Sequence, residues 1–162
     1  MLKLSKLCDY AGVIMAQMAR EPGKPMAATE IAQYTGLPHP TVSKTLKLLL
    51  RAGLLHSRRG AQGGYQLAFA PEEIRASDII AAIEGPVAMT SCSHSDQQCN
   101  IAAHCQVGDN WQRVSRAIHE LLESVTLAQL AHPEPLHLTP PRSVSLLASD
   151  APKRQRDLNE RH

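Results

Sequence analysis

The sequence predicts a mainly α-helical protein: a winged helix-turn-helix followed by a long C-terminal dimerisation helix. Three observations predict this class. Apolar residues recur at helical spacing through much of the first 131 residues, a basic glycine-rich hairpin follows the third expected helix, and aromatics are only 3% of a chain that is 43% hydrophobic. A core without aromatics must consist of Leu, Ile, Val, Ala and Met, which favours helices over sheets.

Three helices are expected first. Apolar residues at helical spacing predict a helix over 4–21, which the proline- and glycine-containing turn at 22–25 ends. A short helix over about 28–35 follows and stops at a glycine. The third helix begins near Pro40, because the missing proline N–H costs nothing in a first turn, and runs to about Leu50–Ala52.

Two short strands and two more helices complete the expected elements. Residues 54–57 and 64–67 have strand-like composition and flank a basic, glycine-rich loop at 58–63, which predicts a hairpin. A short capped helix is expected over about 78–84. An amphipathic helix is expected over 110–131, with its apolar face marked at helical spacing.

The charge is unevenly distributed along the chain. Residues 1–66 hold nine Lys and Arg against three acids, whereas 67–131 hold three against eight. A basic half followed by an acidic half suits a nucleic-acid-binding unit joined to a different unit. We therefore expect a DNA-binding domain at 1–70, a cysteine-loop and dimerisation region at 71–131, and a disordered, proline-rich tail at 132–162.

Composition also excludes several classes of protein. No apolar run approaches the roughly 20 residues needed to cross a bilayer, and the N-terminus lacks a signal-peptide pattern, so a cytoplasmic protein with no membrane partner is expected. In that reducing compartment the four cysteines are expected to be free, reactive or metal-binding rather than disulfide-bonded. No catalytic constellation or cofactor-binding glycine motif is present, so we expect no enzymatic activity.

Helix, turn, helix and basic hairpin is the order of a winged helix-turn-helix, whose second helix enters the major groove while the hairpin reaches phosphates or the minor groove. The residues predicted to contact DNA are His39, Thr41, Ser43, Lys44, Lys47, Arg58, Arg59, Gly60 and Gly63. The apolar stripe predicted to be buried is Val42, Leu46, Leu49 and Leu50. The alternative is a helical hairpin for protein contacts with solvated arginines.

Three cysteines, Cys92, Cys99 and Cys105, fall in a polar segment between two expected helices. Structural zinc sites usually contain a closely spaced cysteine pair, which is missing here. Thiolates in a roomy loop suit an iron–sulfur cluster, because its irons are several ångströms apart and accept soft sulfur ligands. Free cysteines or a redox switch pair remain alternatives.

The whole pattern resembles the winged-helix iron–sulfur transcription regulators of the IscR/NsrR type. The resemblance covers residues 1 to about 131 and rests on five features: Leu4–Ala11, the wing Arg59–Tyr65, the three cysteines, Trp111 and Thr126–Leu130. The first seven residues look most like the subgroup that regulates the SUF cluster-assembly operon. The resemblance implies a homodimer joined through the helix at 110–131, a palindromic duplex operator and a [2Fe–2S] or [4Fe–4S] cluster.

The fourth cluster ligand departs from one branch of the family. IscR-type proteins have a histidine three residues after the last cysteine, where this chain has Gly108. NsrR-type proteins use an aspartate from the first helix of the partner subunit, and Asp9 stands at the matching position, so the resemblance makes Asp9 the predicted ligand. The competing candidates are Cys8, His94, His104 and Asp109.

The apolar face of the 110–131 helix supplies the predicted dimer interface: Trp111, Val114, Ile118, Leu121, Leu122 and Val125. The function implied is a cluster-sensing transcription regulator that represses SUF-type genes. One alternative is a regulator of the same fold that uses its cysteines as a thiol, nitric-oxide or redox switch. Another is a redox carrier, which would leave the basic wing unexplained.

Overall fold

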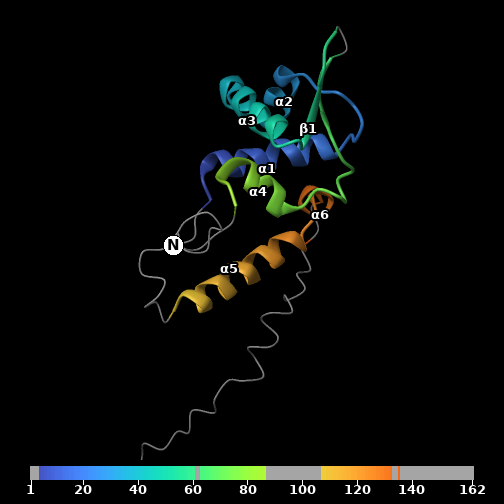
Figure 1. Ribbon diagram of the computed structural model, residues 1–162. Helices are drawn as coiled ribbons and strands as arrows, with labels where there is room; N and C mark the ends of the chain where they lie inside the picture. The colour runs from blue at the N-terminus through green and yellow to red at the C-terminus, as the bar shows by residue number, and fades with distance from the viewer. Residues whose placement is uncertain (1–3, 61–62, 87–106, 133–134, 136–162) are drawn as a thin grey trace, which may run out of the picture.

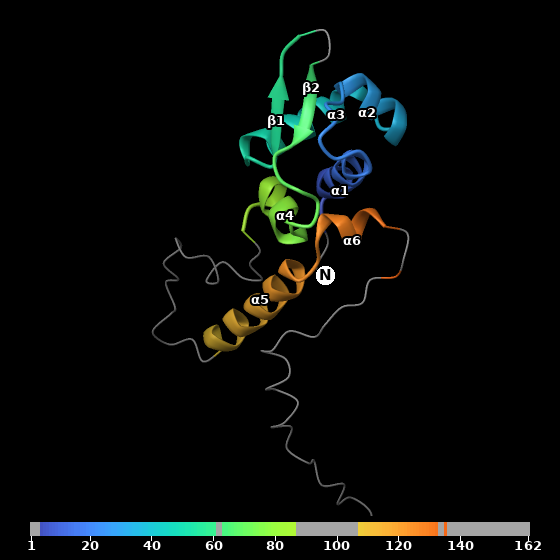
Figure 2. The same ribbon diagram turned by 90° about the vertical axis from the view of Figure 1, so that its right-hand side faces the viewer.

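The computed structural model describes residues 4–60, 63–86, 107–132 and 135, and Figures 1 and 2 show its arrangement. It is mainly helical with one small antiparallel sheet. The elements in chain order are α1 (Lys6–Ala19), α2 (Ala28–Thr35), α3 (His39–Arg51), β1 (Leu55–Arg58), β2 (Gly64–Leu67), α4 (Ala76–Glu84), α5 (Gly108–Glu123) and α6 (Leu127–Ala131).

Local capping explains where the first two helices begin. The Ser5 side chain accepts a hydrogen bond from the Cys8 backbone N–H at 3.2 Å, as a helix N-cap does. At the start of α2, the Glu30 carboxylate accepts from the Ala27 N–H at 2.7 Å and satisfies a donor that the helix leaves unpaired.

Helix α1 lies at the centre of the fold and packs against α2, α3, α4 and α6 (Figure 1). The largest fully buried side chains are aliphatic or small polar, as expected from the composition: Ile14, Met15, Ile31, Val42, Thr45, Leu46, Leu49, Leu55, Ile74 and Leu127. Leu50, expected in the buried stripe, is only partly buried. The core is continuous across residue 70, because Ile74 and Leu127 belong to the same cluster as Ile14.

The hairpin pairs Leu55 with Leu67 and Arg58 with Gly64. It extends past the helices at the end of the molecule that also carries α2 and α3, and α5 lies at the opposite end (Figure 2). The segment between α1 and α2 adds a third backbone partner, because Met26 and Tyr65 exchange N–H···O hydrogen bonds of 2.9 and 2.8 Å.

The expected single helix over 110–131 is two helices, so that prediction was wrong. At the break, the Thr126 hydroxyl accepts from the Gln129 N–H at 3.2 Å, and the Gln129 side chain accepts from the Thr126 N–H at 2.9 Å. This capping box starts α6 as a new helix. Periodicity missed the break because apolar residues keep their spacing across it.

The break also moves Val125 away from the face predicted for dimerisation. Its carbonyl accepts a hydrogen bond from the Ala76 N–H at 2.9 Å, and the Leu127 N–H donates to the Ile74 carbonyl at 2.8 Å. Val125 is 6% exposed within its own subunit and belongs to the fold's interior. The sequence assigned it to the interface because it continues the apolar stripe of α5.

None of the helices in the described ranges is long and apolar enough to span a membrane. The expected tail at 132–162 lies outside the described residues apart from His132 and Pro135.

Candidate nucleic-acid interface

Helix α3 buries one face completely. Val42, Leu46 and Leu49 are each 0% exposed, which confirms their predicted burial. Thr45, which the sequence reasoning did not single out, is also fully buried, and its hydroxyl donates to the Thr41 carbonyl at 2.9 Å. A buried hydroxyl that is satisfied in this way carries little penalty, so the helix can keep a polar residue on its packed face.

The remaining side chains of α3 are available on the outer surface. His39, Lys44 and Lys47 are exposed, whereas Thr41 and Ser43 are half-buried. His39 is the first residue of the helix. In helix-turn-helix proteins the N-terminal residues of this helix are the ones that meet base edges, and His39, Thr41 and Ser43 occupy that part of α3.

The turn between α2 and α3 is set by a glycine and a threonine. Gly36 ends α2 with φ +69, a conformation that costs most residues free energy but suits glycine. The Thr35 hydroxyl donates to the Ile31 carbonyl at 2.6 Å and accepts from the Leu37 N–H at 3.5 Å. These contacts fix the direction in which α3 leaves the turn.

The wing turns tightly at its tip. The Gly63 N–H donates to the Gly60 carbonyl at 2.9 Å. A Cβ at Gly63 would lie 2.4 Å from the Arg58 carbonyl oxygen, so only glycine fits there. Arg58 and Arg59 are exposed on the ascending side of the wing, and residues 61–62 lie outside the described residues.

The basic side chains predicted to contact DNA are not paired with acidic side chains in the described structure. In the part of the chain that the structure describes, Lys44, Lys47, Arg58 and Arg59 form no ion pair. Phosphate binding gains most from cations that need not first break a protein ion pair. The exposed face of α3 and the wing therefore form a basic, unneutralised surface at one end of the molecule.

The close contact between Gly64 and Met26 at the base of the wing was not predicted from the sequence. A Cβ on Gly64 would lie 2.5 Å from the Met26 carbonyl oxygen, and Gly64 has φ +154. The close approach lets β2 pair with Met26 and joins the wing to the segment before α2. A glycine inside a strand often marks such an approach, so Gly64 was a signal that could have suggested it.

The predicted ligands Cys92, Cys99 and Cys105, and the competitors His94 and His104, lie outside the described residues. The segment that contains them leaves α4 beyond Glu84 and Gly85. The Glu84 carboxylate accepts a hydrogen bond at 3.0 Å from the backbone N–H of Ser5, the residue that caps α1. The C-terminal end of α4 is thus tied to the residue that caps α1.

The first turn of α1 places its two candidate ligands differently. Asp9 is exposed, and its carboxylate forms no ion pair with another described residue. Cys8 is 4% exposed, and burial, then the negative charges of Glu84 and Asp9, raise the pKa of its thiol. Asp109, another competitor, is exposed in the first turn of α5. Within the described ranges, no three His, Cys, Asp or Glu residues come together as a metal site.

The apolar face of α5 is only partly buried in the described structure. Trp111 is 41% and Val114 40% exposed, while Ile118, Leu121 and Leu122 are half-buried. Figures 1 and 2 show α5 projecting from the body, with only its C-terminal end near α4 and α6. The structure therefore brings five of the six predicted interface residues onto one helix, and places Val125 elsewhere.

A helix-turn-helix whose second helix and wing form a basic surface defines the class of winged-helix DNA-binding regulators. Comparison with protein families agrees: residues 4–133 match the model of Rrf2, described as iron-dependent transcriptional regulator. The chain belongs to the Rrf2 family of transcription regulators.

Individual relatives support the same assignment. The chain is 33% identical over 131 residues to the HTH-type transcriptional regulator CymR of Bacillus subtilis, covering 80% of this chain and 90% of that protein. The structure of B. subtilis CymR, described as the global cysteine regulator, has a TM-score of 0.64 at 36% identity over 81% of this chain and 97% of that one. The structure of T. potens IscR has a TM-score of 0.60 at 33% identity, over 80% and 85%. These relatives are named as regulators, and the protein is a DNA-binding transcription regulator rather than an enzyme.

Proposed function

We propose that this protein is a homodimeric, cluster-sensing repressor of SUF-type iron–sulfur assembly genes that acts in the cytoplasm. Residues 1–70 would bind a palindromic duplex operator, and 71–131 would sense the cluster and join the subunits. In each subunit His39, Thr41 and Ser43 would meet base edges, while the basic residues of α3 and the wing, together with Gly60 and Gly63, would approach phosphates.

The observation that carries the sensing proposal is the hydrogen bond from Ser5 to Glu84. It joins the C-terminal end of α4, which precedes the cysteines in the chain, to the residue that caps α1, and α1 packs against α3. A change in the conformation of the cysteine segment would therefore act on the helix that supports the recognition helix. Such a change alters DNA affinity only if the two conformations bind DNA differently.

The donor set fits an iron–sulfur cluster. Cys92, Cys99 and Cys105 would supply three soft thiolate ligands, and the exposed carboxylate of Asp9 in the partner subunit would supply a hard, labile fourth. Three cysteines and one other ligand suit a [2Fe–2S] or a [4Fe–4S] cluster. When bound, the cluster supplies iron–sulfur bonds that oxygen, nitric oxide or iron shortage can break.

The homodimer is proposed on the exposed apolar face of α5. Trp111, Val114, Ile118 and Leu121 recur at helical spacing, and a second copy of the chain would bury them. This face lies at the end of the molecule opposite the basic surface, so a dimer formed through it would leave α3 and the wing of each subunit uncovered.

A second candidate function is a thiol switch on the same fold. It is favoured by the similarity to B. subtilis CymR, described as a global cysteine regulator. In that case the cysteines would respond through sulfur chemistry without iron.

Anaerobic purification followed by visible absorption and iron and sulfide analysis separates the two functions. A cluster regulator contains iron and sulfide that Cys92→Ala, Cys99→Ala or Cys105→Ala removes. Cys8→Ala is the matched control, because that cysteine is buried beside α4 and is not expected to bind iron. A colourless wild-type protein that iron and sulfide cannot reconstitute would contradict the cluster, and thiol-dependent DNA binding would then support the switch.

The predicted fourth ligand has its own control. Asp9→Ala should make the cluster easier to lose on exposure to air, whereas Asp109→Ala should not. DNA affinity is then measured with and without cluster on a duplex selected from a random library. Equal affinity in both states would contradict sensing while leaving DNA binding intact.

A further inference from the structure

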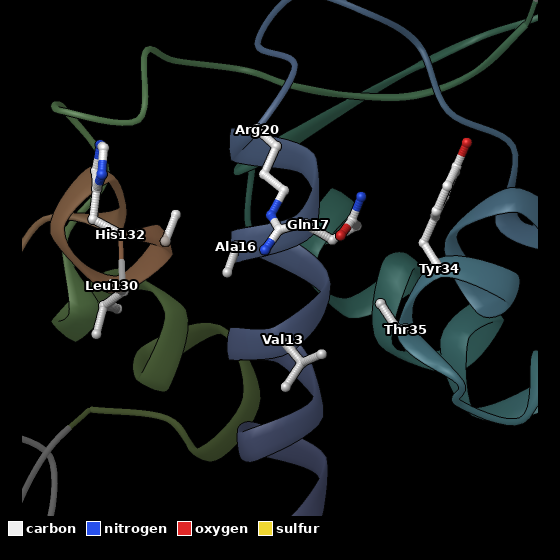
Figure 3. A pocket seen from close by; sticks show the side chains of 9 residues that line it. Val13, Ala16, Gln17, Arg20, Tyr34, Thr35, Leu130 and His132 are labelled. Atoms are coloured by element: carbon white, nitrogen blue, oxygen red, sulfur yellow. The ribbon is translucent and has the colours of Figure 1, made fainter. Parts of the chain in front are cut away.

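An open groove with a volume of about 460 Å³ lies between α1, α2 and α6 (Figure 3), and its described lining includes no residue of α3 or the wing. Helix α1 forms its floor, and α2 and α6 form its two walls. Val13 and Ala16 of α1 and Leu130 of α6 supply apolar surface, with Val13 41% and Leu130 39% exposed. This volume is within the range of sites that take small organic molecules.

The polar groups of the groove gather toward one end. Figure 3 shows Arg20 and Gln17 reaching from α1 between the imidazole of His132 and the ring of Tyr34, with Val13 toward the other end. None of the described residues that line the groove is Asp or Glu. The Arg20 guanidinium forms no ion pair within the described part of the chain.

We propose that this groove binds a small amphipathic carboxylate. Arg20 would pair with the carboxylate, since a guanidinium presents parallel donors that match its two oxygens. The aliphatic or aromatic part of the ligand would lie along Val13, Ala16 and Leu130. The ring of Tyr34, which is 67% exposed, would cover it from the α2 side. Charge complementarity favours an anion, because Arg20 is cationic and none of the described residues that line the groove is acidic.

The position of the groove gives such a ligand a route to regulation. Helix α2 is the first helix of the helix-turn-helix, and α6 follows the helix proposed for dimerisation. A ligand that contacts both walls would stabilise one arrangement of α2 relative to α6. This second step rests on the proposed DNA-binding function, whereas ligand binding itself does not.

The test uses the full-length protein without DNA and two probes of similar shape, 3-phenylpropionate and the neutral 3-phenylpropan-1-ol. Binding is measured by calorimetry, and the site is located from nuclear Overhauser contacts between the phenyl ring and the methyl groups of Val13 and Leu130. The acid should bind in a saturable way and contact those methyl groups, and the alcohol should bind at least tenfold more weakly.

Variants separate recognition of the carboxylate charge from nonspecific hydrophobic binding. Arg20→Gln should raise the Kd for the acid about tenfold or more and leave that for the alcohol unchanged, and Arg20→Lys should have a smaller effect. Arg51→Gln is the matched control, because Arg51 is also exposed at the end of a helix but does not line the groove. Circular dichroism verifies the folding of each variant. The nuclear Overhauser contacts between the phenyl ring and the methyl groups of Val13 and Leu130 locate the site in the wild-type protein, so this test needs no variant.

Several outcomes would overturn the proposal. They are the absence of saturable binding by the acid, equal binding of acid and alcohol, or a Kd that Arg20→Gln leaves unchanged. Contacts between the Val13 or Leu130 methyl groups and another part of the protein, not displaced by saturating acid, would show that the chain fills its own groove. None of these outcomes bears on whether the protein binds DNA, which is measured separately.

Discussion

The Glu84 carboxylate at the end of α4 accepts a hydrogen bond from the backbone N–H of Ser5, 79 positions earlier in the chain, at 3.0 Å. Ser5 in turn caps α1. One side chain therefore connects the C-terminal end of α4 to the residue that caps the helix at the centre of the core.

This contact gives a pH-dependent contribution to stability. The Ser5 side chain, and after it the Ser5 backbone N–H, hold the pKa of Glu84 below its usual range. The contribution is therefore present above the unfolded-state pKa of about 4.3 and is lost as the pH falls through the lower folded value. Glu84→Gln should lower the free energy of unfolding at pH 7 by less than about 1 kcal/mol, because the contact is exposed.

Urea unfolding at pH 7 and pH 3 measures this effect. The difference between wild type and Glu84→Gln should be smaller at pH 3 than at pH 7, because protonation of Glu84 removes the charge that the contact stabilises. Glu72→Gln is the control, since Glu72 is exposed and has no hydrogen-bond partner among the described residues. A pH-independent difference would show that the charge of Glu84 is irrelevant.

Gly64→Ala should be strongly destabilising. The new Cβ would lie 2.5 Å from the Met26 carbonyl oxygen in a residue with φ +154, so the wing must separate from its base. We expect a loss of about 2 kcal/mol or more from steric overlap and backbone strain. Gly12→Ala is the opposite case, because its Cβ would meet nothing within 4 Å in the middle of α1, and it should stabilise by about 0.5–1 kcal/mol. Thermal unfolding of both variants checks the pair.

Neutralising the wing should weaken DNA binding mainly through phosphates. Arg58→Gln and Arg59→Gln should each reduce affinity on all duplexes and lower the slope of log K against log salt by about one. Arg113→Gln, on exposed α5 at the other end of the molecule, should leave that slope unchanged. Fluorescence anisotropy across a salt series gives the slopes. An unchanged slope in both wing variants would remove the wing from the interface.

Val114→Glu should dissociate the proposed dimer, because a buried carboxylate without a partner is costly. Val13→Glu is a closely matched control: Val13 is 41% exposed and Val114 40%, but Val13 lies on α1 beside the groove. Light scattering of the eluted protein should show a monomer for the first variant and a dimer for the second. If both variants elute as dimers, the interface lies on a surface other than α5.

The last short helix offers a test of its packing. Leu127 is 0% exposed against the core, whereas Leu130 in the same helix is 39% exposed. Leu127→Ala should cost about 2–5 kcal/mol through lost burial and the cavity left behind. Leu130→Ala should cost well under half as much. Similar losses in chemical denaturation would mean that α6 does not insert Leu127 as described.

The sequence alone predicted what depends on neighbours along the chain. The second helix was expected at 28–35 and is found at Ala28–Thr35, because glycine at its end and the Glu30 cap act within a few residues. The hairpin and the buried face of α3 followed from glycine placement and helical periodicity in the same way. The candidate DNA contacts could be named because they lie on these local elements.

The tertiary structure decided what depends on distant residues meeting. The break between α5 and α6 is supported by pairing with the segment before α4, which helical periodicity cannot register. The contacts of Met26 with Tyr65 and of Ser5 with Glu84 join residues far apart in sequence. The groove beside α1 likewise exists only because α2 and α6 pack on either side of it. Local preferences set each element, whereas burial of one continuous core chose which elements touch.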